Sequence, residues 1–166
     1  MAEAETEETT PDVEAFRLRV FVEGLIQRGA ADTVDENLEL ADLAARLDGN
    51  ANAVLFRSAG PEGAEVVGNV MGSRERLAAA FGIGKADLLG EVLARLGRPQ
   101  PTVEVSASDA PVQQVVWQGD DADLTRLPVP FQHGNDGAPY LSAAIDFTVN
   151  PETGLANVGC RRLMLR

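Results

Sequence analysis

The sequence is poor in cysteine and lysine and contains no long apolar run. Its one cysteine, Cys160, excludes an internal disulfide framework and is typical of a protein in a reducing cytoplasm. No apolar stretch approaches the roughly 18 residues needed to span a bilayer, and the acidic amino terminus does not resemble a signal peptide. We therefore expect a cytoplasmic protein that is not bound to a membrane.

Basic residues are also scarce relative to acidic ones. The chain has 14 Lys and Arg, of which Lys85 is the only lysine, against 26 Asp and Glu, so its net charge is −12. This balance disfavours nucleic-acid binding, which needs a basic surface. The apolar share of 45% and the charged share of 24% are ordinary for a soluble globular protein, and 166 residues suffice for one domain plus the start of another.

Changes in composition divide the chain into three parts. Residues 1–12 form an acidic tail without apolar periodicity, which we predict to be disordered. Residues 13–98 alternate helical and strand patterns and predict a small α/β domain, whereas residues 99–166 open on the stiff Pro99-Gln100-Pro101 linker and are rich in β-branched residues. The spacing predicts helices at 16–29, 40–47, 73–81 and 88–96, and strands at 54–56, 66–67, 140–149 and 155–165.

The segment 68–76, GNVMGSRER, places glycines and two arginines before a predicted helix, as phosphate-binding loops do. It lacks both the Gly-Lys-Ser/Thr ending and the G-x-G-x-x-G spacing. We therefore interpret it as a tight strand-to-helix turn in which Gly68 and Gly72 supply permissive backbone and Ser73 caps the helix.

Two further reactive side chains have no partners at a useful spacing. His133 lies in the long loop 118–139 without a second His or a Glu at ligand spacing, and we interpret it as a solvated loop residue. Cys160 could act as a nucleophile, but no base is positioned near it in the sequence. A buried structural thiol is the favoured interpretation.

The closing strand carries a hydrogen-bonding amide, Asn157, and a fixed positive charge, Arg162. Their odd separation places them on opposite faces of a regular strand. Gly159 lies between them, and a glycine inside a strand is typical of a bulge or of close backbone approach to a ligand. We predict a departure from regular β geometry between Val158 and Arg161 that brings both side chains to one pocket. From the residues alone, a surface arginine and a turn-side asparagine remain the alternative.

Several segments follow one another in a recognisable order. They are the opening helix, ELADLAARL, VLFR followed by VVGNVMGSRERLAAAFG, DLTRLPVP, DGAPYLSAAI and PETGLANVGCRR. Their order resembles the N-terminal third of the UbiD family of decarboxylases, which use prenylated FMN, and the similarity runs from about residue 14 to the last residue. The resemblance implies an α/β (α+β) fold, in which the small α/β domain is followed by the beginning of a β-barrel-like flavin-binding domain.

In that family the Asn of the final motif helps to hold Mn²⁺ or Mg²⁺ against the cofactor phosphate, and the Arg five residues later belongs to a catalytic Glu-Arg-Glu network. The resemblance therefore assigns metal and cofactor binding to Asn157, catalysis and cofactor binding to Arg162, and cofactor contacts to Gly159, Cys160 and Arg161. It implies prenylated FMN, with K⁺ as an additional ion to consider. The implied reaction is reversible non-oxidative decarboxylation of a small aromatic or α,β-unsaturated carboxylic acid.

The resemblance also implies that the site is incomplete. The family's remaining metal ligands, His and Glu, and both glutamates of the network follow the final Arg, so this sequence does not contain them. We expect a C-terminal portion or a larger partner polypeptide to complete the site within a homo- or hetero-oligomer, and we expect the chain alone to be inactive and to aggregate. Two alternatives stay open: a non-catalytic assembly subunit, and a plain FMN-binding barrel.

Overall fold

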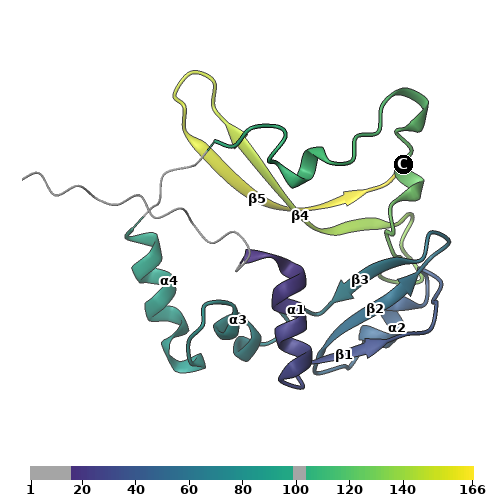
Figure 1. Cartoon of the computed structure of the whole chain (residues 1–166), viewed down its shortest axis with the longest axis horizontal. Coiled ribbons are helices and arrows are strands. Elements are labelled where there is room, and N and C mark those ends of the chain that lie inside the picture. The colour runs from purple at the N-terminus through teal and green to yellow at the C-terminus, as the bar shows by residue number, and fades with distance from the viewer. Residues whose placement is uncertain (1–15, 99–103) are drawn as a thin grey trace, which may run out of the picture.

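The computed structural model describes residues 16–98 and 104–166, which form a mixed α/β layer and a separate β-hairpin (Figure 1). The predicted acidic tail 1–12 and the Pro99-Gln100-Pro101 linker lie outside the described residues. Within the described part of the chain, no helix is long and apolar enough to cross a membrane. The elements in chain order are α1 Leu18–Gln27, β1 Ala31–Val34, α2 Leu43–Leu47, β2 Ala53–Ala59, β3 Ala64–Gly68, α3 Arg74–Ala80, α4 Leu88–Leu96, β4 Tyr140–Val149 and β5 Ala156–Met164.

The first part contains a three-stranded sheet in the order β1-β2-β3. Strand β1 runs parallel to β2, and β3 pairs with β2 in the antiparallel sense. The β2–β3 hairpin confirms the prediction, but β1 did not show in the sequence pattern. This strand has four residues and only one of them, Ala31, is buried, so it has too few apolar positions to give a recognisable alternation.

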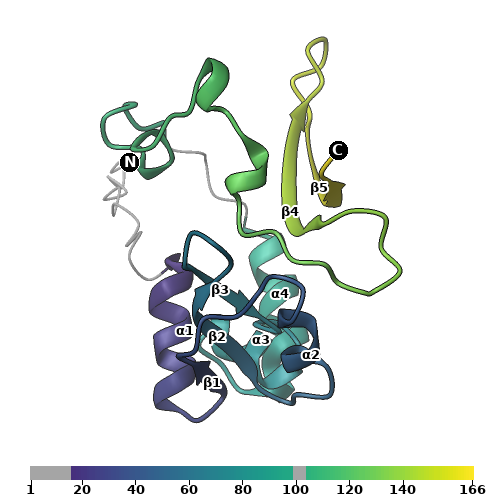
Figure 2. The same cartoon turned by 90° about the vertical axis from the view of Figure 1, so that its right-hand side faces the viewer.

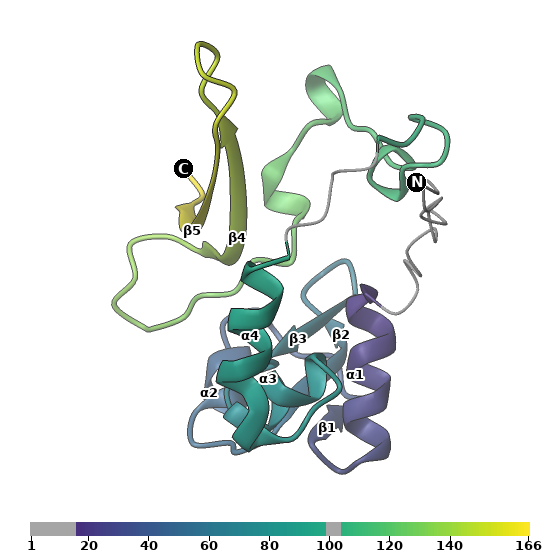
Figure 3. The same ribbon diagram turned by 90° about the vertical axis from the view of Figure 1, so that its left-hand side faces the viewer.

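Two clusters of buried side chains hold this sheet, one on each face. Helix α1 lies on one side and α2 on the other, with α3 and α4 following in the chain (Figures 2 and 3). On the α1 side Leu25 packs against Ala31 and Ala53. On the α2 side Leu43 packs against Val54 and Phe56. Adjacent residues of β2 therefore serve opposite faces, which is why its sequence is almost continuously apolar.

The strand-to-helix turn at 68–76 is a structural element. The Ser73 hydroxyl caps α3 by accepting a hydrogen bond from the Arg76 amide at 3.1 Å, as predicted. Contrary to expectation, the left-handed residue is Asn69, with φ of 56°, and not a glycine. Gly72 instead provides space, because a Cβ there would lie 2.8 Å from Arg76 Nη2. The turn therefore needs glycine for close packing.

Arg76 is buried to 5% exposure and holds this turn together. Its guanidinium donates to the carbonyls of Val70 at 3.0 Å, Ala51 at 2.7 Å and Asn69 at 3.0 Å. All of these acceptors are backbone groups, so the side chain is fully engaged inside the fold. Of the two arginines that suggested phosphate binding, Arg76 is thus a structural residue.

Substituting Ser73 by Ala is expected to lower the free energy of unfolding by about 1 kcal/mol, because the Arg76 amide at the start of α3 loses its acceptor. Chemical denaturation followed by far-ultraviolet circular dichroism measures this loss. Ser73→Asp is the control, since a carboxylate also caps and should keep the stability near that of the parent chain. Equal losses in both variants would contradict a capping role.

The segment 104–139 contains short 3₁₀ turns and no strand, so its β-branched residues do not extend the sheet. No strand forms around the prolines on either side of Val129, but the backbone there is not simply extended, because the Val129 amide donates a turn hydrogen bond to the Leu127 carbonyl at 2.8 Å. Val129 itself is buried. Arg126 stacks on Trp117 with its guanidinium carbon 4.5 Å from the ring centroid, and it lies 3.8 Å from Glu62 in the β2–β3 turn. Within the described residues, the second part thus ends in a two-stranded sheet and not in a closed barrel.

Candidate functional site

Strands β4 and β5 form the hairpin that carries every predicted site residue. Their ladder is regular from the pair Val149–Ala156 to the pair Ala144–Arg161. The predicted irregularity between Val158 and Arg161 is therefore wrong.

The register shift lies instead on β4, where Leu141 to Ala144 spans one residue more than the facing part of β5, opposite Arg162. Gly159 has a different purpose from the one its position suggested. A Cβ at Gly159 would lie 2.6 Å from Oδ1 of Asp146 on the paired strand. Gly159 allows the carboxylate of the neighbouring strand to approach closely. In the sequence, a glycine with this role looks the same as a glycine that forms a bulge.

The regular ladder fixes which side chains share a face. Asn157, Gly159 and Arg161 lie on one face together with Asp146, which we call the polar face. Arg162 lies on the opposite face, where it contacts Tyr140. The structure therefore does not bring Asn157 and Arg162 to the same side of the hairpin.

On the polar face, the side chains of Asp146 and Arg161 form an ion pair. Arg161 Nε lies 3.2 Å from Asp146 Oδ1, with the two side chains 55% and 36% exposed. The same oxygen is buried and lacks a partner with hydrogen-bond geometry. The distance between Arg161 Nε and Asp146 Oδ1 is that of an ion pair, but the geometry is not that of a hydrogen bond. The sequence did not indicate a role for Asp146, because its pairing with Gly159 on the other strand is known only from the strand register.

The opposite face combines an arginine with exposed apolar side chains, and we call it the arginine face. The guanidinium carbon of Arg162 lies 5.7 Å from the centroid of the Tyr140 ring, a cation–π distance. None of the ion pairs found among the described residues involves Arg162. Ile145, Phe147 and Val158 on this face are 60%, 76% and 57% exposed. A fixed positive charge beside apolar surface suits a ligand with a carboxylate and an apolar body.

Two other predicted side chains are placed clearly. Cys160 is a free, exposed thiol on the arginine face, so the prediction of a buried thiol is wrong. Among the described residues, β4 and β5 form a sheet of two strands only, and the Cys160 position on it is exposed. His133 is exposed, and its Nδ1 accepts a hydrogen bond from the Asn135 amide at 3.1 Å, which confirms a loop role.

The fit of a divalent cation can be tested on the side chains of the hairpin. Asn157 is exposed, and its amide oxygen is a hard neutral ligand of the kind that Mg²⁺ and Mn²⁺ accept. The described residues contain no cluster of three His, Cys, Asp or Glu side chains that could hold a metal. The described residues thus fit as the source of one ligand, Asn157, and do not by themselves form a metal site.

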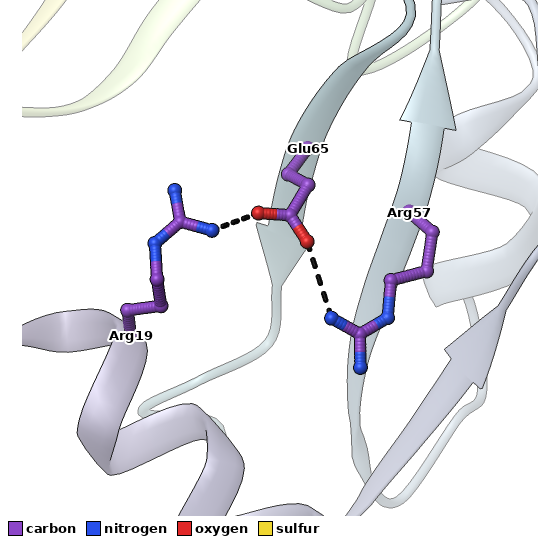
Figure 4. A network of polar contacts seen from close by, with 3 residues as sticks. All are labelled: Arg19, Arg57 and Glu65. Atoms are coloured by element: carbon purple, nitrogen blue, oxygen red, sulfur yellow. Dashed lines mark hydrogen bonds and ion pairs between the residues drawn. The ribbon is translucent and has the colours of Figure 1, made fainter.

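A concavity of about 1010 Å³ lies between α1 and the strands β2 and β3. At its edge, Glu65 of β3 pairs with Arg19 of α1 and with Arg57 of β2, the latter at 3.2 Å (Figure 4). Because both basic groups share this one acidic partner, the network links the helix to the sheet. Exposed pairs of this kind contribute little stability each, and they offer no reactive group to a ligand.

Among the described residues, two carboxyl groups have a lowered pKa, and both lie away from the hairpin. A hydrogen bond from the Thr125 hydroxyl, reinforced by the Thr125 amide, lowers the pKa of Asp123. A hydrogen bond from Lys85 lowers the pKa of Glu75. Both groups are fully exposed, so these shifts describe local surface contacts.

Substituting Gly159 by Ala is expected to disrupt the polar face, because the new Cβ would meet the Asp146 carboxylate at 2.6 Å and the Arg161 guanidinium at 3.0 Å. Both side chains can move aside at the cost of their ion pair, so we expect a loss of less than about 1 kcal/mol in the free energy of unfolding. Denaturant titration monitored through the hairpin amide signals in NMR measures it. Gly134→Ala is the control, since nothing lies within 4 Å of a Cβ there, and equal losses would refute the steric reading.

Both parts of the chain match models of one protein family. Residues 30–96 match the N-terminal domain of the 3-octaprenyl-4-hydroxybenzoate carboxy-lyase family, UbiD. Residues 103–166 match the Rift-related domain of the same family. The chain belongs to the UbiD family. Its mixed α/β fold is that of the N-terminal part of UbiD-class enzymes.

Solved UbiD-class structures show the same fold. An evolved dimeric form of HmfF from Pelotomaculum thermopropionicum, in complex with prFMN, superposes with a TM-score of 0.79 at 30% identity, over 89% of this chain and 35% of that one. Vanillic acid decarboxylase from Sedimentibacter hydroxybenzoicus in its closed form matches with a TM-score of 0.75 at 30% identity, over 90% of this chain and 35% of that one. An uncharacterized protein from Rhodospirillum rubrum is 34% identical over 80% of this chain and 28% of its own length. The chain thus spans about a third of the length of its relatives.

Proposed function

We propose that this chain supplies the N-terminal part of the active site of a prenylated-FMN decarboxylase acting on a small aromatic or α,β-unsaturated carboxylic acid. One observation carries the proposal: a guanidinium without an ion-pair partner among the described residues shares the arginine face with exposed apolar side chains. This combination suits an acid whose carboxylate needs a cation and whose body needs apolar contact. The relatives point the same way, since HmfF has been solved with prFMN and with FMN.

Each site residue has a role in this proposal. Arg162 binds the substrate carboxylate. In the completed site it also stabilises the ionised form of a neighbouring glutamate. Asn157 offers its amide oxygen to Mn²⁺ or Mg²⁺ at the cofactor phosphate. The segment Gly159–Arg161, including Cys160, passes next to the cofactor. When bound, prenylated FMN accepts the electrons released as carbon dioxide leaves, while the protein orients the substrate and stabilises charge.

The site needs a further polypeptide segment to be complete. Among the described residues β5 pairs only with β4, so its outer edge is open, and Phe147 and Val158 are uncovered. A C-terminal portion or a larger partner chain would cover both and would bring the remaining metal ligands and glutamates. A cytoplasmic location and an oligomeric assembly are part of this proposal. They are supported by the single cysteine and by the dimeric form of HmfF.

Co-expression of this chain with the C-terminal two-thirds of a UbiD-class relative, in cells that make prenylated FMN, tests the proposal. We expect a stable complex whose bound cofactor has the mass of prenylated FMN and which releases carbon dioxide from a panel of aromatic acids. A complex that binds FMN of unmodified mass would favour the plain flavin barrel. A complex without turnover, in which the partner retains the cofactor, would favour an assembly subunit.

A further inference from the structure

The hairpin carries two adjacent arginines with different partners. Arg161 lies on the polar face and pairs with Asp146 at 3.2 Å. Arg162 lies on the arginine face beside the uncharged ring of Tyr140, and none of the ion pairs among the described residues involves it. We propose that Asp146 is a specificity-determining residue, which neutralises Arg161 and leaves Arg162 as the one arginine of the pair that binds a carboxylate. This inference rests on the proposed function and adds a residue to it.

The packing around Asp146 indicates that this contact is part of the fold. The ladder sets Asp146 directly opposite Gly159, with Arg161 as its diagonal neighbour, a spacing at which long side chains interact across a sheet. The carboxylate lies over the bare Cα of Gly159, where any Cβ would come within 2.6 Å of it. Asp146 Oδ1 is consequently buried although the residue stands on an otherwise open hairpin.

The pairing has opposite consequences for the two faces. On the polar face the charges of Asp146 and Arg161 cancel, so a cation at Asn157 meets no net repulsion from this pair. On the arginine face the charge of Arg162 is uncompensated and attracts anions. Without Asp146, both faces would present a free guanidinium, and a carboxylate could bind on the wrong side of the hairpin. Discrimination here comes from suppressing the competing site as well as from building the correct one.

NMR titration of this chain with benzoate, a small aromatic carboxylate, tests the inference at a protein concentration at which light scattering shows no aggregation. In the parent chain we expect benzoate to shift the Arg162 Nε–H and Tyr140 ring signals and to leave the Arg161 Nε–H and Asn157 amide signals unchanged. In Asp146→Asn, benzoate should also shift the Arg161 and Asn157 signals, with binding on that face about three- to fivefold tighter than in the parent chain. The added Arg161→Gln substitution should abolish this new binding.

Glu91→Gln is the matched control, because Glu91 forms an ion pair of similar exposure with Arg95, at 2.7 Å on α4. It should leave the benzoate response of the hairpin unchanged. Asp146→Ser provides a second test of the same charge loss should Asp146→Asn disturb the fold, which the dispersion of the amide signals reports. Benzoate shifts confined to the Arg162 side in both Asp146 variants would overturn the inference, as would the absence of any response.

This experiment stays independent of the proposed function. It needs neither cofactor nor turnover, so a chain that fails to complete a decarboxylase can still show the predicted switch in anion binding. Conversely, an active complex in which Asp146→Asn leaves benzoate binding on one face would retain the proposed function and refute the role of Asp146.

Discussion

Replacing Arg162 by Gln in the completed enzyme should lower kcat/KM for an aromatic acid by about 10³-fold. Arg162 is the site's candidate for holding the carboxylate, and its guanidinium meets only the Tyr140 ring among the described residues. Loss of a positioned cation at a reacting carboxylate removes charge stabilisation that water does not replace, which costs two to three orders of magnitude, about 10²–10³. Steady-state measurement of carbon dioxide release against substrate concentration checks the effect.

Arg162→Lys separates charge from geometry. Lysine keeps the positive charge but loses the planar, bidentate fork, so we expect partial activity between that of the parent enzyme and that of Arg162→Gln. Arg95→Gln, a charge loss on α4 far along the chain from the hairpin, should leave turnover unchanged. Full turnover in Arg162→Gln would support a non-catalytic assembly subunit.

Substituting Arg76 by Met is expected to lower the free energy of unfolding by about 3 kcal/mol and the melting temperature by about 10 °C. The methionine would fill part of the space while leaving the carbonyls of Ala51, Asn69 and Val70 without their donor. Buried acceptors that lose their partner keep the cost of desolvation, so the loss should exceed that of a surface substitution. Differential scanning calorimetry and denaturant titration measure both quantities.

The neighbouring Arg74 provides the control, because it begins the same helix and is exposed. Arg74→Met should change the free energy of unfolding by less than about 0.5 kcal/mol. The Arg76 substitution also bears on function, since a phosphate-binding loop at 68–76 would tolerate it structurally. A variant that folds with full stability would contradict the structural role of Arg76.

Long apolar patterns predicted the bounds of helices and strands accurately. The helix at 88–96 and the strand at 140–149 have the predicted bounds, because their periodic apolar residues extend over enough positions to define a period. Strand β1 is too short for this, and α2 is shorter than the apolar spacing from residue 40 indicated. Residues 104–139 contain many β-branched residues but no strand, as the prediction of a long loop at 118–139 requires, because β-propensity alone does not form a strand without a pairing partner.

For the candidate site too, some features could be predicted from the sequence and others could not. The sequence alone, through its motifs, determined the family, the residue types Asn157 and Arg162, and the odd spacing that separates them. Only the tertiary structure decided that the ladder stays regular at Gly159 and that the glycine accommodates Asp146. The physical reason is that register joins residues from two strands, and a single strand's pattern does not contain the identity of its neighbour. The pairing of Arg161 with Asp146, and the isolation of Arg162 beside Tyr140, therefore emerge only when the hairpin closes.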